Sequence, residues 1–322
     1  MRAIQMTEHG GPEVLVPTQL PAPEPAPDQV VVRVEAAGVN FIDTYQRSGL
    51  YAVGLPYVPG MEAAGVVERV GEEVTEAAVG DRVAFAGAPG SYAELVAVPA
   101  AKVVPVPDSV DSRTAAALML QGMTAHYLAY STYRLAQGST AVVLAAAGGV
   151  GRLLVQLAKH VGATVLAATS TEDKAALARA AGADEVIRYR EVDLVEAVRA
   201  ATDGQGADVV YDSVGADTWE SSMDCLRLRG MLVLYGNASG PVPPIDPLEL
   251  NRRGSLYLTR PQLAHYIADR AELTWRAAEL FELAGSGELE VRLDRTWGLA
   301  EAADAHRYLE DGRTTGKLLL VP

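Results

Sequence analysis

The sequence predicts an α/β protein with two domains: a β-rich domain and a domain built on a doubly wound parallel sheet. Its 322 residues exceed what one hydrophobic core usually organises. Short Val-rich runs between turn signals fill the chain up to about residue 123, and strand and helix patterns alternate from Thr124 onward. The first pattern returns near the end of the chain. The expected ranges are therefore 1–123, 124–263 and 264–322, of which the first and the last form one domain.

Strands of the β-rich domain are expected where apolar runs are bounded by Gly, Pro or Asp. These runs are Val30–Val34, Ala64–Val70, Arg82–Phe85 and Ala93–Val98. The closing part of the chain adds a long helix near Gln262–Leu283 and a last strand near Lys317–Val321. Such short strands indicate a small, partly barrel-like domain.

The alternating part of the chain has the pattern of βαβ units and a parallel sheet. Its strands are expected at Ala141–Ala146, Thr164–Thr169, Glu185–Ile187, Asp208–Tyr211 and Met231–Tyr235. Its helices are expected at Val150–Val161, Glu172–Ala181, Asp193–Ala201 and Asp217–Leu226.

Composition excludes several classes of function. The net charge of −14 opposes a nucleic-acid partner, because phosphate binding needs a basic surface. The single cysteine, Cys225, excludes an intrachain disulfide and a multi-cysteine zinc site. Apolar stretches are too short for a membrane helix, and the N-terminus lacks the apolar core of a signal peptide. We therefore expect a cytoplasmic protein with no membrane partner.

A glycine-rich turn follows the first strand of the alternating part, with the sequence Ala146-Ala147-Gly148-Gly149-Val150-Gly151. A strand before it and an apolar-periodic helix after it are the context that a dinucleotide-binding turn requires. Gly148 would let the backbone approach a pyrophosphate, and Gly151 would let the helix pack close to the strand. The free N–H groups of the helix N-terminus would bind the phosphates. The alternative is a tight turn that binds nothing.

The end of the second strand favours NADPH over NADH. An NAD enzyme usually has an Asp or Glu there for the ribose 2′-hydroxyl, but this chain has Thr169, Ser170 and Thr171, followed by Lys174. Small hydroxyls and a cation accept a 2′-phosphate without repelling it. Glu172 is expected in the first helical turn, pointing outward. Lys174 as an ordinary solvated lysine is the alternative.

Several separated motifs resemble one family. They are Gly148–Gly151 with Gln156 and Lys159, Gly38–Asp43, Arg47–Tyr51 and Tyr211–Gly215. Together they are similar to the zinc-free, zeta-crystallin-like quinone oxidoreductases of the medium-chain dehydrogenase/reductase superfamily, over essentially the entire chain. The resemblance implies a GroES-like catalytic domain, a Rossmann cofactor domain, an active-site cleft between them and a homodimer.

The zinc-dependent members of that superfamily carry a Gly-His-Glu segment, where this chain has Gly60-Met61-Glu62. A thioether is a poor zinc ligand, and no cysteine occurs before Cys225. We therefore expect no metal. Without a Lewis acid, alcohol oxidation becomes difficult, whereas a quinone or enone delocalises the charge that develops on reduction.

The resemblance also implies site residues. It assigns Asn40, Asp43 and Tyr51 to the surroundings of the nicotinamide, and Thr124 to a contact with the nicotinamide amide. Asn40 and Tyr51 could donate hydrogen bonds to a developing oxyanion. The alternatives are a turn asparagine, a packing tyrosine and a threonine that caps a helix. A carboxylate at Asp43 could equally orient a neighbour.

Further cofactor contacts are implied for residues after the first two strands. These are Tyr189, Ser213, Asn237, Ser239 and Arg313, in addition to Gly149, Val150 and Ser170 of the segments above. The run Ser255–Thr259 would form an edge strand that pairs with its symmetry mate in a homodimer, or an edge strand within a monomer.

The leading hypothesis is an NADPH-dependent quinone reductase that needs no metal. Reduction of the C=C bond of an α,β-unsaturated aldehyde or ketone uses the same residues and is the alternative. A non-catalytic NADPH-binding protein is the hypothesis from another class.

Overall fold

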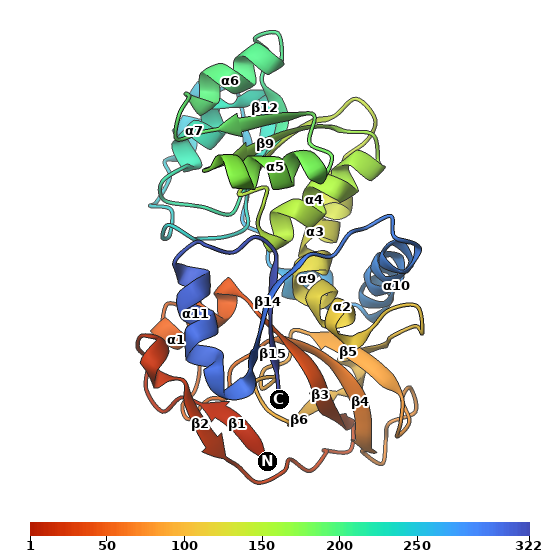
Figure 1. The fold of residues 1–322 in the computed structure, drawn as a ribbon. Helices are drawn as coiled ribbons and strands as arrows, with labels where there is room; N and C mark the ends of the chain where they lie inside the picture. The colour runs from red at the N-terminus through yellow and green to blue at the C-terminus, as the bar shows by residue number, and fades with distance from the viewer. The chain divides into compact units, whose positions relative to one another are not determined.

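The computed structural model describes residues 1–322, which form two compact units (Figure 1). Unit 1 comprises Met1–Met123 and Tyr266–Pro322, and unit 2 comprises Thr124–His265. No helix in the structure combines the length and the apolarity that crossing a membrane requires.

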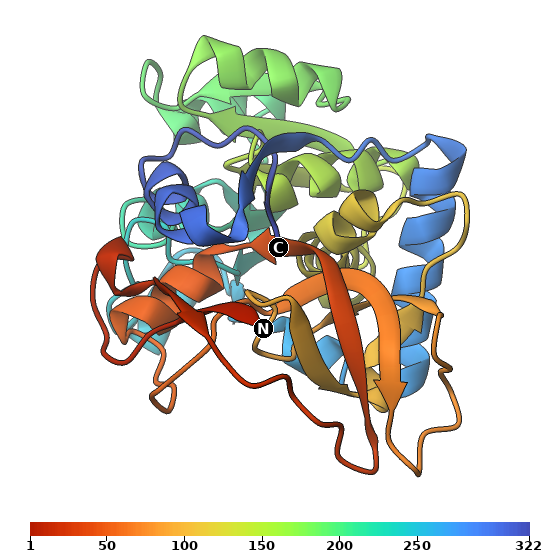
Figure 2. The ribbon, with the colours of Figure 1, turned by 60° about the horizontal axis from the view of Figure 1, so that its bottom comes forward.

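Unit 1 is built on a seven-stranded sheet, most of whose strand pairs are antiparallel. Its strands, in spatial order, are β14 (Leu293–Gly298), β15 (Lys317–Val321), β3 (Gln29–Val39), β4 (Glu62–Val70), β5 (Arg82–Ala86) and β7 (Val103–Pro105), with β6 (Leu95–Pro99) also paired to β3. A separate antiparallel pair joins β1 (Arg2–Gln5) and β2 (Val16–Gln19). In Figure 2 the long strands β3 and β4 run side by side and curve.

Strand β3 is longer than the apolar run Val30–Val34 predicts. It continues through Glu35-Ala36-Ala37-Gly38 to Val39, residues with weak strand preference. Tertiary pairing explains the extension, because this half of β3 bonds β4 on one side and β15 on the other. The strand therefore ends directly before Asn40.

The main helices of unit 1 either contact strands of its sheet or carry some of the polar residues discussed below. They are α1 (Phe41–Ser48), α2 (Ser112–Ala117), α10 (Arg270–Ser286) and α11 (Ala302–Glu310). A helical run with two π-helical turns, Leu118–Gly122 and Leu128–Thr132, flanks α3 (Met123–Tyr127), in which the chain passes from unit 1 to unit 2.

The single long helix expected over Gln262–Leu283 is wrong. The structure has a short helix α9 (Leu263–Tyr266) and then α10, which begins at Arg270 and ends at Ser286. Asp269 caps α10 by accepting hydrogen bonds from the N–H groups of Ala271 and Glu272, which fixes a new helix start. Gly287 ends the helix in the left-handed conformation, with φ 82°.

Unit 2 has a six-stranded, fully parallel sheet, which confirms the doubly wound α/β class. The spatial order is β10 (Glu185–Arg188), β9 (Thr164–Thr169), β8 (Thr140–Leu144), β11 (Ala207–Asp212), β12 (Leu226–Leu234) and β13 (Tyr257–Thr259). Counted from β8 this is the order 3-2-1-4-5-6 of dinucleotide-binding sheets, which places the reversal of direction beside β8.

Helices connect the parallel strands of unit 2. They are α4 (Gly149–His160), α5 (Glu172–Ala180), α6 (Leu194–Ala201), α7 (Trp219–Asp224) and α8 (Pro247–Arg252). Buried aliphatic residues of the strands, such as Val142, Leu166 and Val210, form one core cluster with Leu194 and Val198 of α6. The strands therefore read as nearly continuous apolar runs, as strands covered on both faces do.

Candidate active site

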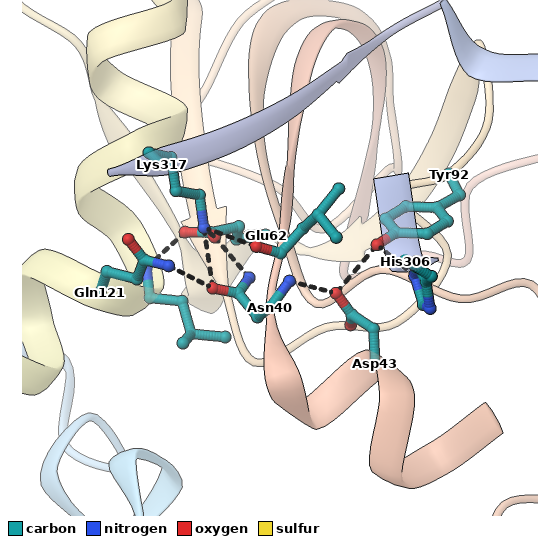
Figure 3. A network of polar contacts seen from close by, with 9 residues as sticks. Asn40, Asp43, Glu62, Tyr92, Gln121, His306 and Lys317 are labelled. Carbon is teal, nitrogen blue, oxygen red and sulfur yellow. Dashed lines mark hydrogen bonds and ion pairs between the residues drawn. The ribbon is translucent and has the colours of Figure 1, made fainter. Parts of the chain in front are cut away.

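A buried ion pair joins Lys317, at the start of β15, to Glu62, at the start of β4 (Figure 3). The side chains are only 2% and 0% exposed. Asn40 lies against both: its Nδ2 donates to Glu62 Oε1 at 2.6 Å, and its Oδ1 accepts from Lys317 Nζ at 2.7 Å. Glu62 Oε2 also accepts from the backbone N–H of Leu120 at 2.5 Å. Buried charges therefore have partners on every side.

Gly38 explains why the sequence can place this pair inside the sheet. A Cβ at residue 38 would stand 2.1 Å from Glu62 Oε1 and 2.7 Å from Lys317 Cε. Any side chain there would displace the ion pair. The glycine of the Gly38–Asp43 motif therefore makes space for charge and is not required by backbone conformation.

The same contacts fix the orientation of the Asn40 amide. Its Oδ1 also accepts from Gln121 Nε2 at 3.2 Å, and one of the two Nδ2 hydrogens is used by Glu62. One amide hydrogen of Asn40 remains for another acceptor. Asn40 is thus a buried, held residue rather than a turn asparagine with positive φ, since its φ is −139°.

A second polar chain begins at Asp43, one turn into α1 (Figure 3). Asp43 Oδ2 accepts from the backbone N–H of Asn40 at 2.8 Å and from Tyr92 Oη at 3.0 Å. Burial raises the pKa of the Asp43 carboxyl from 3.8 to about 7, against the lowering effect of these hydrogen bonds and of Lys317. Its Oδ1 is buried without a hydrogen-bond partner. The carboxyl thus binds the backbone N–H of Asn40, and its role in the reaction remains a prediction.

The second chain continues through His306 to Arg47. Tyr92 Oη lies 3.1 Å from His306 Nε2, and His306 Nδ1 lies 3.1 Å from Arg47 Nη1. Burial, and after it the charge of Arg47, lower the pKa of His306 from 6.5 to about 3. Arg47 Nη2 pairs with the exposed Glu310 at 2.6 Å. The imidazole is therefore neutral at physiological pH.

Tyr51 and Thr124 lie outside these two chains of hydrogen bonds. The Tyr51 ring packs edge to face on Tyr45, with ring centroids 5.3 Å apart, and it is partly exposed. Thr124 is buried in α3 and is the first residue of unit 2. Their assignments to the nicotinamide remain predictions.

In unit 2, the turn after β8 has the geometry that its glycines predict. Gly148 caps α4 in an extended conformation, so the N–H groups of Gly149, Val150 and Gly151 stand in the first turn of a twelve-residue helix. A Cβ on Gly151 would lie 2.4 Å from Ala145 O, so only glycine lets the helix pack this close to the strand. The turn fits a pyrophosphate because its free donors belong to the backbone.

The end of β9 is basic and hydroxyl-rich. Thr169 Oγ1 is buried without a hydrogen-bond partner, and the half-buried Ser170 follows it at the carboxyl end of β9. Thr171 caps α5 by accepting from the N–H of Lys174. Burial lowers the pKa of Lys174, and the charge of Arg190 lowers it further, so the two cations are neighbours. Two cations near free hydroxyls fit the 2′-phosphate of NADPH.

Arg190 was not predicted from the sequence. It follows β10, which pairs in parallel with β9, so the carboxyl ends of both strands meet at the same edge. The N–H of Tyr189 donates to Thr169 O at 3.2 Å, which places Tyr189 beside the end of β9. Glu172 is exposed in the first turn of α5 and pairs with Arg179 and with Arg188, the residue of β10 that is in register with Thr169.

The loops after β11 and β12 bring three predicted residues together. Ser213 O accepts from the N–H of Ala238, next to Asn237, and Gly236 approaches Ser213 so closely that a Cβ would lie 2.5 Å from its carbonyl oxygen. Ser239 Oγ donates to Val214 O at 2.9 Å and accepts from the N–H of Asp217 at 3.0 Å. The Ser239 hydroxyl therefore joins the two loops to each other.

Arg313 belongs to unit 1, where it follows α11. It is exposed, pairs with Asp311 at 2.5 Å and lies over the Tyr308 ring, 4.9 Å from its centroid. These contacts give it a structural role at the surface. Its assignment to the cofactor remains a prediction.

The structure contains no cluster of three or more His, Cys, Asp or Glu side chains that could hold a metal ion. The Met61 thioether, in place of the histidine of zinc enzymes, accepts from Gln46 Nε2 at 3.6 Å and from Tyr57 Oη at 3.8 Å. These neighbours are a packing environment for a thioether.

Two family models match the chain. The alcohol dehydrogenase GroES-like domain matches residues 26–108, and the zinc-binding dehydrogenase model matches residues 149–275. The first lies in unit 1, and the second lies mostly in unit 2 and begins within the glycine-rich turn after β8.

Full-length relatives are more specific. A quinone oxidoreductase of Pseudomonas aeruginosa is 48% identical over 100% of this chain and 99% of its own. A 2-haloacrylate reductase of a Burkholderia species is 44% identical over 97% and 96%. The solved structure of Escherichia coli quinone oxidoreductase complexed with NADPH superposes with a TM-score of 0.98, at 44% identity, and covers 100% of both chains. The chain therefore belongs to the quinone oxidoreductase family of the medium-chain dehydrogenase/reductase superfamily.

Proposed function

We propose that this protein is an NADPH-dependent quinone reductase that needs no metal. The observation that carries the proposal is the end of β9, where Ser170, Lys174 and Arg190 replace the acidic residue of NAD enzymes. The relatives named quinone oxidoreductase support the acceptor. NADPH, when bound, supplies the hydride that reduces the acceptor. The test is a steady-state screen of NADPH and NADH against 1,4-quinones and α,β-unsaturated aldehydes.

The chain's own residues would bind and orient the cofactor. Backbone N–H groups of Gly149, Val150 and Gly151 face the pyrophosphate, because they lack helical partners at the start of α4. Ser170, Lys174 and Arg190 hold the 2′-phosphate. Tyr189, Ser213 and Asn237 line the same carboxyl edge of the sheet, where open α/β sheets bind ligands.

The Lys174→Ala variant is expected to bind NADPH about 10- to 150-fold more weakly, since a charge-assisted hydrogen bond contributes about 1.5–3 kcal/mol. Binding of NADH should change little, because it lacks the 2′-phosphate. Fluorescence titration of both cofactors measures the difference. If Arg190 shares the phosphate, the double variant with Arg190→Ala loses more than the single one.

Arg179→Ala is the matched control for Lys174→Ala. It removes the same charge from the same helix, but from its last turn, where Arg179 pairs with Glu172. Both cofactors should bind it as they bind the wild type. Equal weakening of NADH and NADPH by Lys174→Ala would contradict a role in reading the phosphate.

On the acceptor side, Tyr51 and Asn40 would stabilise the oxyanion that forms when a quinone is reduced. Asn40 retains one amide hydrogen, and its orientation is fixed by Glu62 and Lys317. Tyr51 offers a partly exposed ring and a hydroxyl. Groups held in place before reaction stabilise developing charge without reorganising. Thr124 and Asp43 complete the proposed set, Asp43 through its bond to Asn40.

Tyr51→Phe is expected to lower kcat by about 10-fold while NADPH affinity stays unchanged, because the hydroxyl acts on charge that appears only during reduction. Stopped-flow measurement of NADPH oxidation separates this effect from product release. Tyr45→Phe removes a hydroxyl from the ring packed against Tyr51 and should leave kcat near the wild-type value. An unchanged kcat in Tyr51→Phe would reduce Tyr51 to a packing surface.

Reduction of a C=C bond conjugated to a carbonyl is the second candidate. The observation that favours it is the relative named 2-haloacrylate reductase, at nearly the same identity as the quinone oxidoreductases. Both reactions need a donor to an oxyanion, so the same residues serve either. Product analysis separates a hydroquinone from a saturated carbonyl compound. If no quinone or α,β-unsaturated carbonyl compound is reduced, the remaining hypothesis is a non-catalytic NADPH-binding protein.

Purified protein is expected to contain far less than one zinc per chain, and a chelator should leave its activity unchanged. The reason is the donor set: Met61 stands where the zinc enzymes carry a histidine, and no cysteine occurs before Cys225. Elemental analysis on protein purified without chelator makes the measurement. About one zinc per chain would contradict the metal-free proposal.

We further propose that the protein is a cytoplasmic homodimer in which β13 pairs with its symmetry mate. Its domains would comprise residues 1–123 with 264–322, and residues 124–263. β13 is the edge strand of the parallel sheet, and Tyr257 on it and Leu228 nearby are exposed. An edge strand with exposed apolar side chains is a common site of association. Sedimentation equilibrium that returns a monomer mass would contradict the dimer.

A further inference from the structure

A chain of three hydrogen bonds leads from Arg47 through His306 and Tyr92 to Asp43, and each bond has a fixed donor and acceptor. A guanidinium can only donate, so His306 Nδ1 accepts from Arg47 and the imidazole proton is on Nε2. That proton is donated to Tyr92 Oη, and the Tyr92 hydroxyl is left to donate to Asp43 Oδ2 (Figure 3). Arg47 thus determines, through two side chains, which way the Tyr92 hydroxyl points.

The two carboxylate oxygens of Asp43 differ in the number of hydrogen bonds that they accept. Oδ2 receives two donors, the N–H of Asn40 and the Tyr92 hydroxyl, whereas Oδ1 is buried without a hydrogen-bond partner. A proton taken up by this carboxyl therefore binds Oδ1. Its uptake removes the negative charge that both donors stabilise and weakens the bond to the N–H of Asn40.

We infer that Arg47, His306 and Tyr92 are positioning residues of the reaction: they hold Asp43 ionised, and ionised Asp43 holds Asn40 in place. The inference rests on the proposed function, because Asn40 is one of the proposed oxyanion donors. The three side chains are buried and reach Asn40 only through Asp43. Activity should therefore fall when Asp43 takes up a proton.

The surroundings of Asp43 place this event near physiological pH. Burial raises the pKa of Asp43 to about 7. Tyr92, Lys317 and Glu62 act on the Asp43 carboxyl directly. Asp43 raises the pKa of the nearby Tyr57, and His306 and Arg47 are linked to Asp43 through Tyr92. Lys317 and the hydroxyl of Tyr92 lower the pKa of Asp43, and Glu62 raises it. Of these effects on the pKa of Asp43, the hydrogen bond from Tyr92 can be removed by a conservative variant, Tyr92→Phe.

The direct test is a titration of the Asp43 carboxyl by infrared difference spectroscopy, with Asp43→Asn as the blank. We expect a midpoint near 7 in the wild type. Tyr92→Phe removes a donor to the carboxylate, which favours the protonated form, so the midpoint should rise by about one to two pH units. His306→Leu should raise it as well. His306→Gln keeps an acceptor for Arg47 and a donor for Tyr92 and should restore the wild-type midpoint.

The functional test is the pH dependence of kcat/KM for NADPH with 1,4-benzoquinone. An acidic limb should follow the spectroscopic midpoint in the wild type, Tyr92→Phe and His306→Gln, and Asp43→Asn should lack it. A merely structural role would lower kcat/KM at all pH values without moving the limb. A limb that stays fixed while the midpoint moves overturns the inference.

The titration also separates this inference from the proposed function, because it requires no turnover. A wild-type midpoint near the ordinary 3.8 overturns the inference even if no variant folds. An unmoved midpoint in folded Tyr92→Phe overturns it too. If the midpoint moves as expected but no quinone or enone is reduced, the proposed function fails. The control of Asp43 ionisation by Arg47, His306 and Tyr92 then still stands.

Discussion

Lys317→Met is expected to destabilise the protein by about 3–5 kcal/mol, the usual cost of removing one partner of a buried ion pair. Glu62 would remain fully buried with its charge uncompensated, next to Asn40 and the N–H of Leu120. Methionine fills much of the volume of the lysine stem, so the loss reflects charge rather than a cavity. Urea unfolding followed by circular dichroism measures the free energy.

The double variant Lys317→Met/Glu62→Gln is the control for that loss. It removes both charges, and glutamine keeps one of the two oxygens of Glu62 as an acceptor for the neighbouring donors. We expect it to be more stable than Lys317→Met alone by at least about 1–2 kcal/mol, because no unpaired buried charge remains. A double variant that is the less stable of the two would show that the charge of Glu62 is not the source of the loss.

The parts of the fold that depend on local pattern could be predicted from the sequence. Alternating strand and helix segments from Thr124 onward are enough to indicate a parallel sheet, and Gly151 is required by the contact of α4 with Ala145. The break at Asp269 carried a local signal that the apolar pattern obscured. Asp269 stands three residues before Glu272, as in a capping box.

The candidate site depends on contacts that no local pattern contains. Lys317 and Asn40 are 277 residues apart, and they meet because β15 pairs with β3. A lysine before an apolar run normally indicates an exposed strand end, so nothing local marked it as buried. Arg190 could have been found, because consecutive parallel strands usually pair and bring their carboxyl ends together.

The second large effect concerns stability against pH, in which Asp43 and His306 act with opposite sign. The pKa of Asp43 rises from 3.8 to about 7 on folding, so between these values the native state binds a proton that the unfolded state does not. Asp43 therefore makes stability fall as pH rises through this window, by about 1.4 kcal/mol per pH unit.

His306 has the reverse effect. Its pKa falls from 6.5 to about 3 on folding, so between these values the unfolded state binds a proton that the native state does not. Stability consequently rises with pH across that window, again by about 1.4 kcal/mol per pH unit. From 3.8 to 6.5 the two windows overlap, and the contributions of Asp43 and His306 cancel.

Removing either group should expose the other. Relative to the wild type, Asp43→Asn should gain stability as pH rises from about 4 to 6.5, because only His306 still titrates there, and the total reaches about 4 kcal/mol. His306→Gln should lose stability by a similar amount over the same range. Both amides keep hydrogen-bonding groups for Tyr92, so the comparison isolates charge. Urea unfolding of the three proteins at several pH values measures the difference in slope. Parallel curves for wild type and Asp43→Asn would mean that Asp43 ionises alike in the folded and unfolded chains, despite its burial and its unpartnered Oδ1.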